Sequence, residues 1–176
     1  TYLCLQQEVS EDAAARYLLW SEFQDSGRPL ILLIGGTVAS GKSTIATEIA
    51  HLLEIVRIQS TDMLREVMRV MIPQRLLPIL HTSSFDAWKT FPPEDNRDRE
   101  WDQLVADGYR SQAALLAVPC EAVLQRAVEE GVPIIMEGVH VHPALLQRVP
   151  EDSDVIKVYV MLAVLTSKRI KSRLKG

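Results

Sequence analysis

Eight consecutive residues, Gly36 to Ser43, have the types and spacing that bind the phosphates of a nucleotide. Two glycines are separated by four residues, and Lys42 and Ser43 follow the second, which matches G-x-x-x-x-G-K-[ST] without departure. In such a loop, backbone N–H groups surround the phosphates, the lysine reaches the β- and γ-phosphates, and the hydroxyl contacts Mg²⁺. The motif therefore predicts a nucleoside triphosphate site with Mg²⁺, formed by Gly36, Ala39, Ser40, Gly41, Lys42, Ser43 and Thr44.

A carboxylate and two arginines form a second group, Asp62, Arg65 and Arg69. Their spacing of three and four residues places them on one side of a helix. A carboxylate can accept a proton from an attacking hydroxyl, and arginines can hold an anionic substrate. Taken alone, the group would be an acid that stabilises the helix dipole beside two solvated arginines. The position after a predicted strand favours the functional interpretation, because that strand should end in the same crevice as the phosphate loop.

Other polar residues leave two interpretations open. Glu137 ends an apolar strand, so it is either a ligand of Mg²⁺ through water or an ordinary acid at the end of a strand. His81 is either catalytic or a structural hydrogen-bonding histidine. His140 and His142 are separated by one residue, but neither a cysteine cluster nor an HExxH pattern accompanies them, which argues against zinc.

The elements that position these groups are predicted from periodicity. Apolar runs indicate buried strands over residues 30–35, 55–60, 132–136 and 155–163. Apolar residues at helical spacing predict one helix directly after the phosphate loop and another over residues 102–130. Pro119 should bend or interrupt the second helix. Ser10 and Gly27 bracket a further helix, and Thr61 is expected to cap the helix that carries Asp62. The fold class is therefore α/β.

The composition is that of an ordinary globular domain. Apolar residues make up 47% and charged residues 24%, which argues against disorder. A net charge of −4 gives no electrostatic basis for nucleic-acid binding, and no apolar run approaches the roughly 20 residues of a membrane span. Cys4 and Cys120 show no metal spacing, so a reduced, cytoplasmic setting is expected. A homo-oligomer is left open.

The chain divides into two parts. Residues 1–28 are expected to form an N-terminal helical segment packing on the core, and residues 29–176 the nucleotide-binding domain. Within it, residues 73–101 contain many hydroxyls, aromatics and prolines, which predicts a substrate-side excursion from the core. The basic residues of 166–176 are either a truncated lid or a solvated helix end.

Five stretches together resemble the 2-phosphoglycerate kinase family: GGTVASGKSTIA, STDMLREVMR, LHTSSFDAW, the helix that contains GYRSQ, and IIMEGVHVHP. The resemblance covers Ala14 to Ala163. It implies a P-loop NTPase three-layer α/β/α fold, with a mostly parallel sheet in the nucleoside-kinase-like order 2-3-1-4. The family also has an N-terminal region resembling a nucleotide-binding regulatory cone and C-terminal lid helices, which are expected here only as residues 1–9 and 166–176.

The resemblance implies transfer of the ATP γ-phosphoryl group to the hydroxyl of 2-phosphoglycerate, a small phosphorylated acid, which gives 2,3-bisphosphoglycerate. Lys42, Asp62 and Arg65 would be catalytic, with Asp62 orienting or deprotonating the hydroxyl. Ser43 and Glu137 would hold Mg²⁺. The substrate would contact Asp62, Arg65, Arg69, His81, Thr82, Ser83, Arg110, Gln112 and His140.

Two alternatives remain at this point. One is a kinase for another hydroxyl acceptor, resembling zeta toxins or chloramphenicol phosphotransferases. The other is an ATP-binding module without catalysis, which would not need the face formed by Asp62, Arg65 and Arg69. A GTPase is disfavoured, because no NKxD-like guanine signature is present and the third predicted strand ends in Met-Glu-Gly rather than DxxG.

Overall fold

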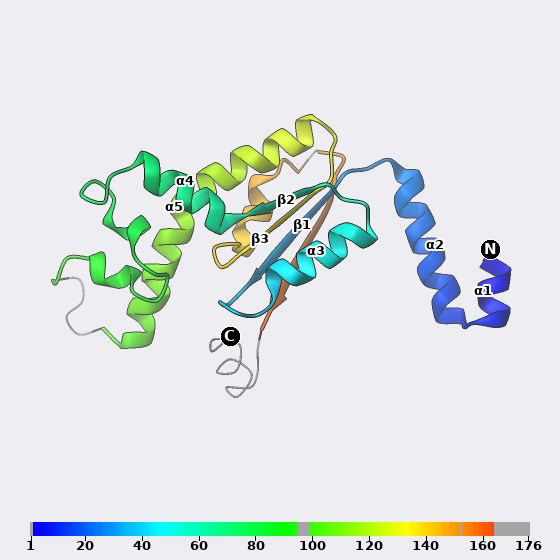
Figure 1. Ribbon diagram of the computed structural model, residues 1–176, viewed down its shortest axis with the longest axis horizontal. Coiled ribbons are helices and arrows are strands. Elements are labelled where there is room, and N and C mark those ends of the chain that lie inside the picture. Colours follow the sequence, from blue (N-terminus) through cyan, green and yellow to red (C-terminus); the bar gives the residue numbers. More distant parts are fainter. Residues whose placement is uncertain (1, 95–98, 152, 164–176) are drawn as a thin grey trace.

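A parallel β-sheet is the centre of the protein (Figure 1). The computed structural model describes residues 2–94, 99–151 and 153–163. Within them, all strand pairs are parallel and the order is β2-β3-β1-β4, which confirms the predicted α/β class and the order 2-3-1-4. The strands are β1 (Leu30–Gly36), β2 (Arg57–Ser60), β3 (Ile134–Gly138) and β4 (Ile156–Leu162).

The register of the strands brings their carboxyl ends to one edge. Ile34 of β1 lies opposite Glu137 of β3, and Ser60 of β2 lies opposite the same glutamate. The phosphate loop follows β1 and the helix that carries Asp62 follows β2. The sheet therefore places the phosphate loop, Asp62 and Glu137 at a single edge, where ligands bind in open parallel sheets.

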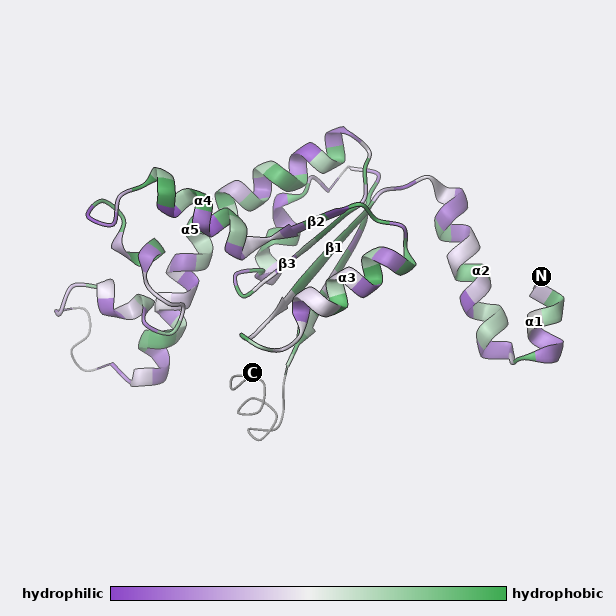
Figure 2. Ribbon diagram, in the orientation of Figure 1, coloured by the Kyte–Doolittle hydropathy of each residue, from purple (hydrophilic) through white to green (hydrophobic). Residues whose placement is uncertain are grey.

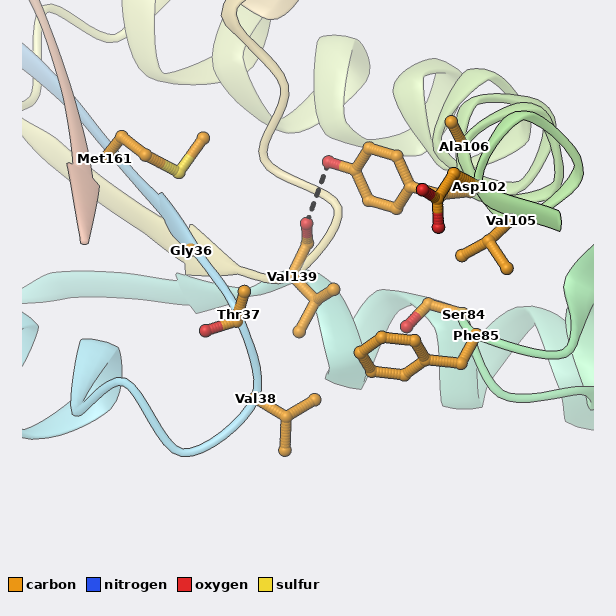
Figure 3. A pocket seen from close by; sticks show the side chains of 11 residues that line it. Gly36, Thr37, Val38, Ser84, Phe85, Asp102, Val105, Ala106, Val139 and Met161 are labelled. Atoms are coloured by element: carbon orange, nitrogen blue, oxygen red, sulfur yellow. Dashed lines mark hydrogen bonds between the residues drawn. The ribbon is translucent and has the colours of Figure 1, made fainter. Parts of the chain in front are cut away.

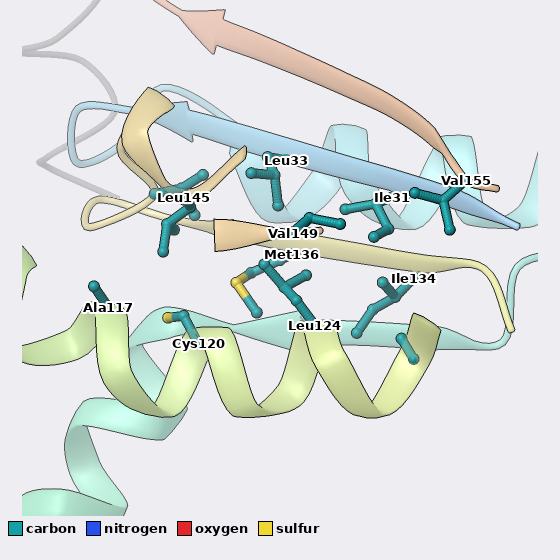
Figure 4. Packing of buried hydrophobic residues seen from close by; sticks show 12 residues of the cluster. Ile31, Leu33, Ala117, Cys120, Leu124, Ile134, Met136, Leu145, Val149 and Val155 are labelled. Carbon is teal, nitrogen blue, oxygen red and sulfur yellow. The ribbon is translucent and has the colours of Figure 1, made fainter. Parts of the chain in front are cut away.

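Helices cover both faces of the sheet. They are α3 (Lys42–Leu52), α4 (Thr61–Met71) and α5 (Trp101–Glu129), with short 3₁₀ turns η1 (Pro78–His81), η2 (Ala87–Thr90) and η3 (Pro143–Arg148). Side chains of β1 alternate between the faces. Ile31 and Leu33 pack with Leu124 of α5 (Figure 4), and Leu32 packs with Ala46 of α3. Figure 2 shows the two central strands, β1 and β3, in the green of hydrophobic residues, whereas β2 is largely hydrophilic.

Two local details differ from the sequence prediction, and the bend expected at Pro119 is present. The N-cap of α4 is Ser60, whose hydroxyl accepts a hydrogen bond from the Asp62 N–H, and Thr61 is the first helical residue. β2 starts at Arg57, two residues later than predicted, and the Ile55 N–H just beyond the end of α3 bonds back to the Ala50 carbonyl. α5 continues through Pro119, and its two halves run in different directions (Figure 1), as expected for a proline inside a helix.

The N-terminal segment consists of α1 (Tyr2–Glu8) and α2 (Glu11–Ser26), which extend away from the sheet (Figure 1). Ser10 caps α2 and Gly27 ends it in the left-handed conformation, as predicted. Phe23 packs against the apolar cluster on the α3 side of the sheet. Closer packing of residues 1–28 on the core stays a prediction, and residues 166–176 lie outside the described part. None of the described helices is long and apolar enough to cross a membrane.

Gly108 permits close packing of α5 against the turn η2. A Cβ at this position would lie 2.4 Å from the backbone nitrogen of Trp88. We therefore expect Gly108→Ala to lower the free energy of unfolding by about 1–3 kcal/mol, although alanine is the better helix former. Urea denaturation measures the change.

Gly131→Ala is the matched control for this substitution. Gly131 has a φ of +62°, and no atom lies within 4 Å of the position that a Cβ would take, so only backbone strain of about 1 kcal/mol is expected there. A Gly108→Ala protein as stable as the wild type would contradict the close packing.

Candidate active site

The phosphate loop has the backbone conformation that its glycines allow. Gly41 has a φ of +90° and is the residue before α3, and Ala39 has a φ of +59°. Lys42 is only 7% exposed, and its Nζ donates to the Thr37 carbonyl across the loop at 2.7 Å. The lysine is therefore held over the loop, where an anionic phosphate oxygen can replace the carbonyl as its partner.

A hydroxyl and a carboxylate meet beside this loop. Ser43 Oγ donates to Glu137 Oε1 at 3.1 Å, and Glu137 is 6% exposed. No group of three or more His, Cys, Asp or Glu side chains that could hold a metal occurs in the described ranges. A single carboxylate with one hydroxyl fits Mg²⁺, which binds through one or two protein ligands, water and substrate phosphates.

The charge of Lys42 is affected both by Glu137, the partner of Ser43, and by Asp62 of the group on α4. Burial lowers the pKa of Lys42, while the negative charges of Glu137 and Asp62 act in the opposite direction. Asp62 lies in the first turn of α4, and its side chain is 62% exposed. Lys42 is thus influenced by the buried carboxylate that bonds to Ser43 and by the exposed carboxylate at the start of α4.

Arg65 and Arg69 share the side of α4 that carries Asp62, but their present contacts differ. Arg65 donates through Nε to the Leu80 carbonyl at 2.9 Å and through Nη2 to the Thr82 carbonyl. Arg69 pairs with Glu66 at 2.8 Å. Arg65 therefore holds the excursion in place, and substrate binding by the two arginines stays a prediction.

Further polar residues of the excursion also contact its backbone. His81 Nε2 lies 2.9 Å from the Ile72 carbonyl, which agrees with the structural interpretation of this histidine. The Thr82 hydroxyl donates to the Ile79 carbonyl, and Ser83 bonds to Asp86. The described structure gives these side chains folding roles, and contact with substrate stays a prediction for them.

Gln112 and His140 form a buried pair behind Asp62. Gln112 is fully buried, and His140 is 2% exposed. Burial, assisted by the charge of Arg65, lowers the pKa of His140 to about 4, and Asp62 acts weakly in the opposite direction. The imidazole is therefore neutral near pH 7.

This burial predicts a loss of stability in acid. The unfolded chain binds a proton to His140 below about pH 6.5, whereas the folded chain does so only near pH 4, so stability falls as pH falls through this window. We expect a contribution of about 3 kcal/mol across the window. Denaturant unfolding of the wild type and His140→Gln at pH 7 and pH 4.5 measures it.

The control is His51→Gln, at an exposed position of α3. This variant should lose as much stability in acid as the wild type, whereas His140→Gln should lose less. An equal loss in all three proteins would contradict the assignment of the acid effect to His140.

Arg110 is the predicted site residue that lies apart from the others. It is 67% exposed by side chain, pairs with Asp107 at 2.8 Å, and lines a separate hollow with His142 and Arg148. Residues two apart on a helix point to different sides. Gln112 therefore points into the core while Arg110 points outward, away from the other predicted site residues.

A cavity of about 360 Å³ opens beside the phosphate loop (Figure 3). Thr37 and Val38 of the loop, Phe85 of the excursion and Tyr109 of α5 face it, and the Tyr109 hydroxyl donates to the Val139 carbonyl at 3.0 Å. These four residues were not predicted as site residues. Tyr109 lies in the GYRSQ stretch, which was the only signal available for it.

The parallel 2-3-1-4 sheet, with a phosphate loop after β1 and Glu137 at the end of β3, defines a P-loop α/β protein of nucleoside-kinase-like topology. No protein-family model matches the chain. It is 42% identical over 147 residues to a 2-phosphoglycerate kinase of Pyrococcus furiosus, covering 84% of this chain and 47% of the relative. It is 38% identical over 163 residues to a 2-phosphoglycerate kinase of Pyrococcus horikoshii, covering 93% and 52%.

The resemblance to the 2-phosphoglycerate kinase family is therefore confirmed over the part of these proteins that the chain matches. The chain spans about half the length of the curated relatives it matches. A solved structure of a putative kinase from Chloroflexus aurantiacus is 16% identical, with a TM-score of 0.42 over 84% of this chain and 68% of that one. A similarity of this size supports no conclusion about function.

Proposed function

We propose that this chain carries the catalytic P-loop domain of an ATP-dependent kinase. The kinase transfers the γ-phosphoryl group to the hydroxyl of 2-phosphoglycerate and gives 2,3-bisphosphoglycerate. The relatives supply the reaction, because they are named 2-phosphoglycerate kinase. The proposal includes ATP and Mg²⁺ as cofactors and a cytoplasmic location.

One observation carries the proposal from the geometry. The parallel register brings Glu137 of β3 and the start of α4, which carries Asp62, to the edge where the phosphate loop follows β1, so that two carboxylates from different strand ends lie at that edge. A protein that only binds a nucleotide needs the phosphate loop and an acid for the metal. A second, exposed carboxylate beside the loop supports the proposal that an acceptor hydroxyl binds next to it. A kinase requires such an acceptor.

Each residue then has a physical role in the proposed reaction. The loop N–H groups and Lys42 neutralise the phosphate charge that develops during transfer. Ser43 and Glu137 would hold Mg²⁺, which would supply positive charge to offset that of the phosphates. Asp62 orients the acceptor hydroxyl and accepts its proton, and Arg69 attracts the anionic acceptor.

The cavity in Figure 3 favours a second candidate acceptor. Its lining is mostly apolar, and none of the described residues that line it is lysine, arginine or histidine. A small molecule with an apolar part and a hydroxyl would fit such a cavity better than a highly charged phosphoglycerate. The second candidate is therefore a P-loop kinase for an uncharged hydroxyl acceptor.

A screen of acceptors separates the two candidates. The chain is incubated with ATP and Mg²⁺ and with 2-phosphoglycerate, 3-phosphoglycerate, glycerate or apolar alcohols, and ADP release is measured. We expect the fastest ADP release with 2-phosphoglycerate. Faster release with an apolar alcohol would favour the second candidate, and a rate with every acceptor no better than with water would contradict both.

A further inference from the structure

The hydrogen bonds of Gln112 determine how its amide is oriented. Its Nε2 lies 2.5 Å from the Ile79 carbonyl and 3.1 Å from the Thr82 carbonyl, so this end of the amide must be the donor. The other end, Oε1, is then an acceptor. A reversed amide would place an oxygen against two carbonyl oxygens, which is unfavourable.

This orientation in turn determines the tautomer of His140. His140 Nε2 lies 2.7 Å from Gln112 Oε1, so Nε2 must carry a hydrogen and donate it. In a neutral imidazole the remaining nitrogen, Nδ1, then has a free lone pair. Within the described structure Nδ1 is buried and has no hydrogen-bond partner.

The free nitrogen faces Asp62. His140 Nδ1 lies 3.9 Å from Asp62 Oδ1, and the His140 side chain is 1% exposed whereas that of Asp62 is 62% exposed. The imidazole is fixed by Gln112 and by the nearly parallel ring of Tyr109, whose centroid is 6.2 Å away. The aspartate is the exposed partner, and a small rotation about its side-chain bonds would close the remaining distance.

A lone pair and an ionised carboxylate cannot share a hydrogen bond until a proton arrives. Because Nδ1 has no hydrogen, it offers nothing to the carboxylate form of Asp62. Once Asp62 is protonated, its hydroxyl can donate to Nδ1. The contact therefore stabilises Asp62 after it has taken the proton and does not stabilise the ionised Asp62 that precedes the transfer. An interaction that strengthens as the reaction proceeds in this way can raise kcat.

We propose that His140 is a positioning residue that acts through Asp62: its Nδ1 accepts a hydrogen bond from the Asp62 carboxyl once Asp62 has taken the proton of the substrate hydroxyl. The inference rests on the proposed function. In the step, the O–H bond of the acceptor breaks as its oxygen bonds to the γ-phosphorus, and the bond from this phosphorus to the β–γ bridging oxygen breaks. The electron pair leaves with ADP, and the proton stays on Asp62 in a hydrogen bond to His140 Nδ1.

The other groups that face His140 agree with this role. Arg65 places a positive charge near the ring, and Asp62 supplies the opposing negative charge. Tyr109 stacks on the ring but donates its hydroxyl to the Val139 carbonyl, so it does not compete for Nδ1. Imidazolium formation is thus disfavoured, and the ring serves as an acceptor rather than as a second base.

Two substitutions separate this role from a structural one. In His140→Gln the new side-chain amide can keep the hydrogen bond to Gln112, but no atom occupies the position of Nδ1. In His140→Asn the side-chain oxygen can occupy the position of Nδ1, but the hydrogen bond to Gln112 is lost. We expect kcat to fall about tenfold to a hundredfold in His140→Gln and several-fold less in His140→Asn, with the KM for ATP unchanged in both. The reverse order would show that His140 only supports Gln112, and would overturn the proposal.

A second measurement does not depend on turnover or on the identity of the acceptor. The ¹⁵N chemical shifts of His140 in the wild-type chain at pH 7 report which nitrogen carries the hydrogen. A protonated Nε2 and an unprotonated Nδ1 are expected, and a hydrogen on Nδ1 would overturn the proposal even in an active enzyme. If the tautomer is as expected and no acceptor is phosphorylated, the proposed function fails separately.

Discussion

Replacing Lys42 with alanine lowers the rate of phosphoryl transfer by about a hundredfold to a thousandfold, the range found when one donor to a developing charge is removed. The reason lies in the position of Nζ, which is buried above the loop and bonded only to the Thr37 carbonyl among the described contacts. That carbonyl is a weak partner compared with a phosphate oxygen. Initial rates at saturating ATP measure the loss, and isothermal titration measures the accompanying change in ATP affinity.

The matched control for Lys42 is Lys89→Ala. The Lys89 side chain is 59% exposed and pairs with Asp86 on the surface of η2. Its removal takes away the same charge from the protein without touching the loop, so the rate should stay within about twofold of the wild type. Equal rates for Lys42→Ala and the wild type would show that the loop does not bind the transferred phosphates.

Asp62→Asn is expected to lower kcat by about a hundredfold or more, since a positioned general base contributes at least that much to a rate. The affinity for ATP should change little, because Asp62 lies on α4 and the loop contacts of the phosphates remain. The amide has nearly the shape of the carboxylate but cannot accept the proton. Rapid-quench measurement of a single turnover separates this chemical step from product release.

Asp12→Asn serves as the control for Asp62. Asp12 has an 80% exposed side chain on α2 and forms a surface pair with Arg16. The same change of charge at that position should leave kcat unaltered. Equal losses of kcat and of ATP affinity in Asp62→Asn would place Asp62 on the nucleotide side and argue against a role with the acceptor.

The fold and the phosphate loop could be predicted because they follow from local patterns. A run of aliphatic residues, a glycine loop and apolar residues at helical spacing predict β1, the loop and α3 from adjacent residues alone. Glu137 was also found in this way, as an acid at the end of β3. Its bond to Ser43, 94 residues away in the chain, required the parallel register.

The contacts of the excursion could not be predicted, because sequence shows the type of a polar side chain but not its partner. Arg65 was interpreted as an anion-binding residue and is bonded to the carbonyls of Leu80 and Thr82. The backbone carbonyls of an irregular segment have no partners in a helix or sheet. Long side chains such as those of Arg65 and Gln112 donate hydrogen bonds to these carbonyls instead. The excursion is positioned by these bonds, and with it Phe85 at the cavity.

The neutral state and tautomer of His140 were equally hidden in the sequence. They depend on Gln112, which is 28 residues away along the chain, and on two carbonyls of the excursion. A histidine three residues after an acid of a predicted metal site suggested contact with substrate or metal. The structure shows that His140 is buried beside Asp62, which is the basis of the proposed role through the aspartate, and contact of His140 with substrate stays a prediction.

The identity of the phosphorylated product decides whether this chain is the proposed kinase. The chain is incubated with ATP, Mg²⁺ and 2-phosphoglycerate, and the mixture is followed by ³¹P NMR. We expect the two phosphomonoester signals of 2,3-bisphosphoglycerate to grow at the rate at which the γ-phosphate signal of ATP disappears. With Lys42→Ala they should grow about a hundredfold to a thousandfold more slowly. Loss of the γ-phosphate signal with only inorganic phosphate as product, or no loss at all, would contradict the proposed reaction.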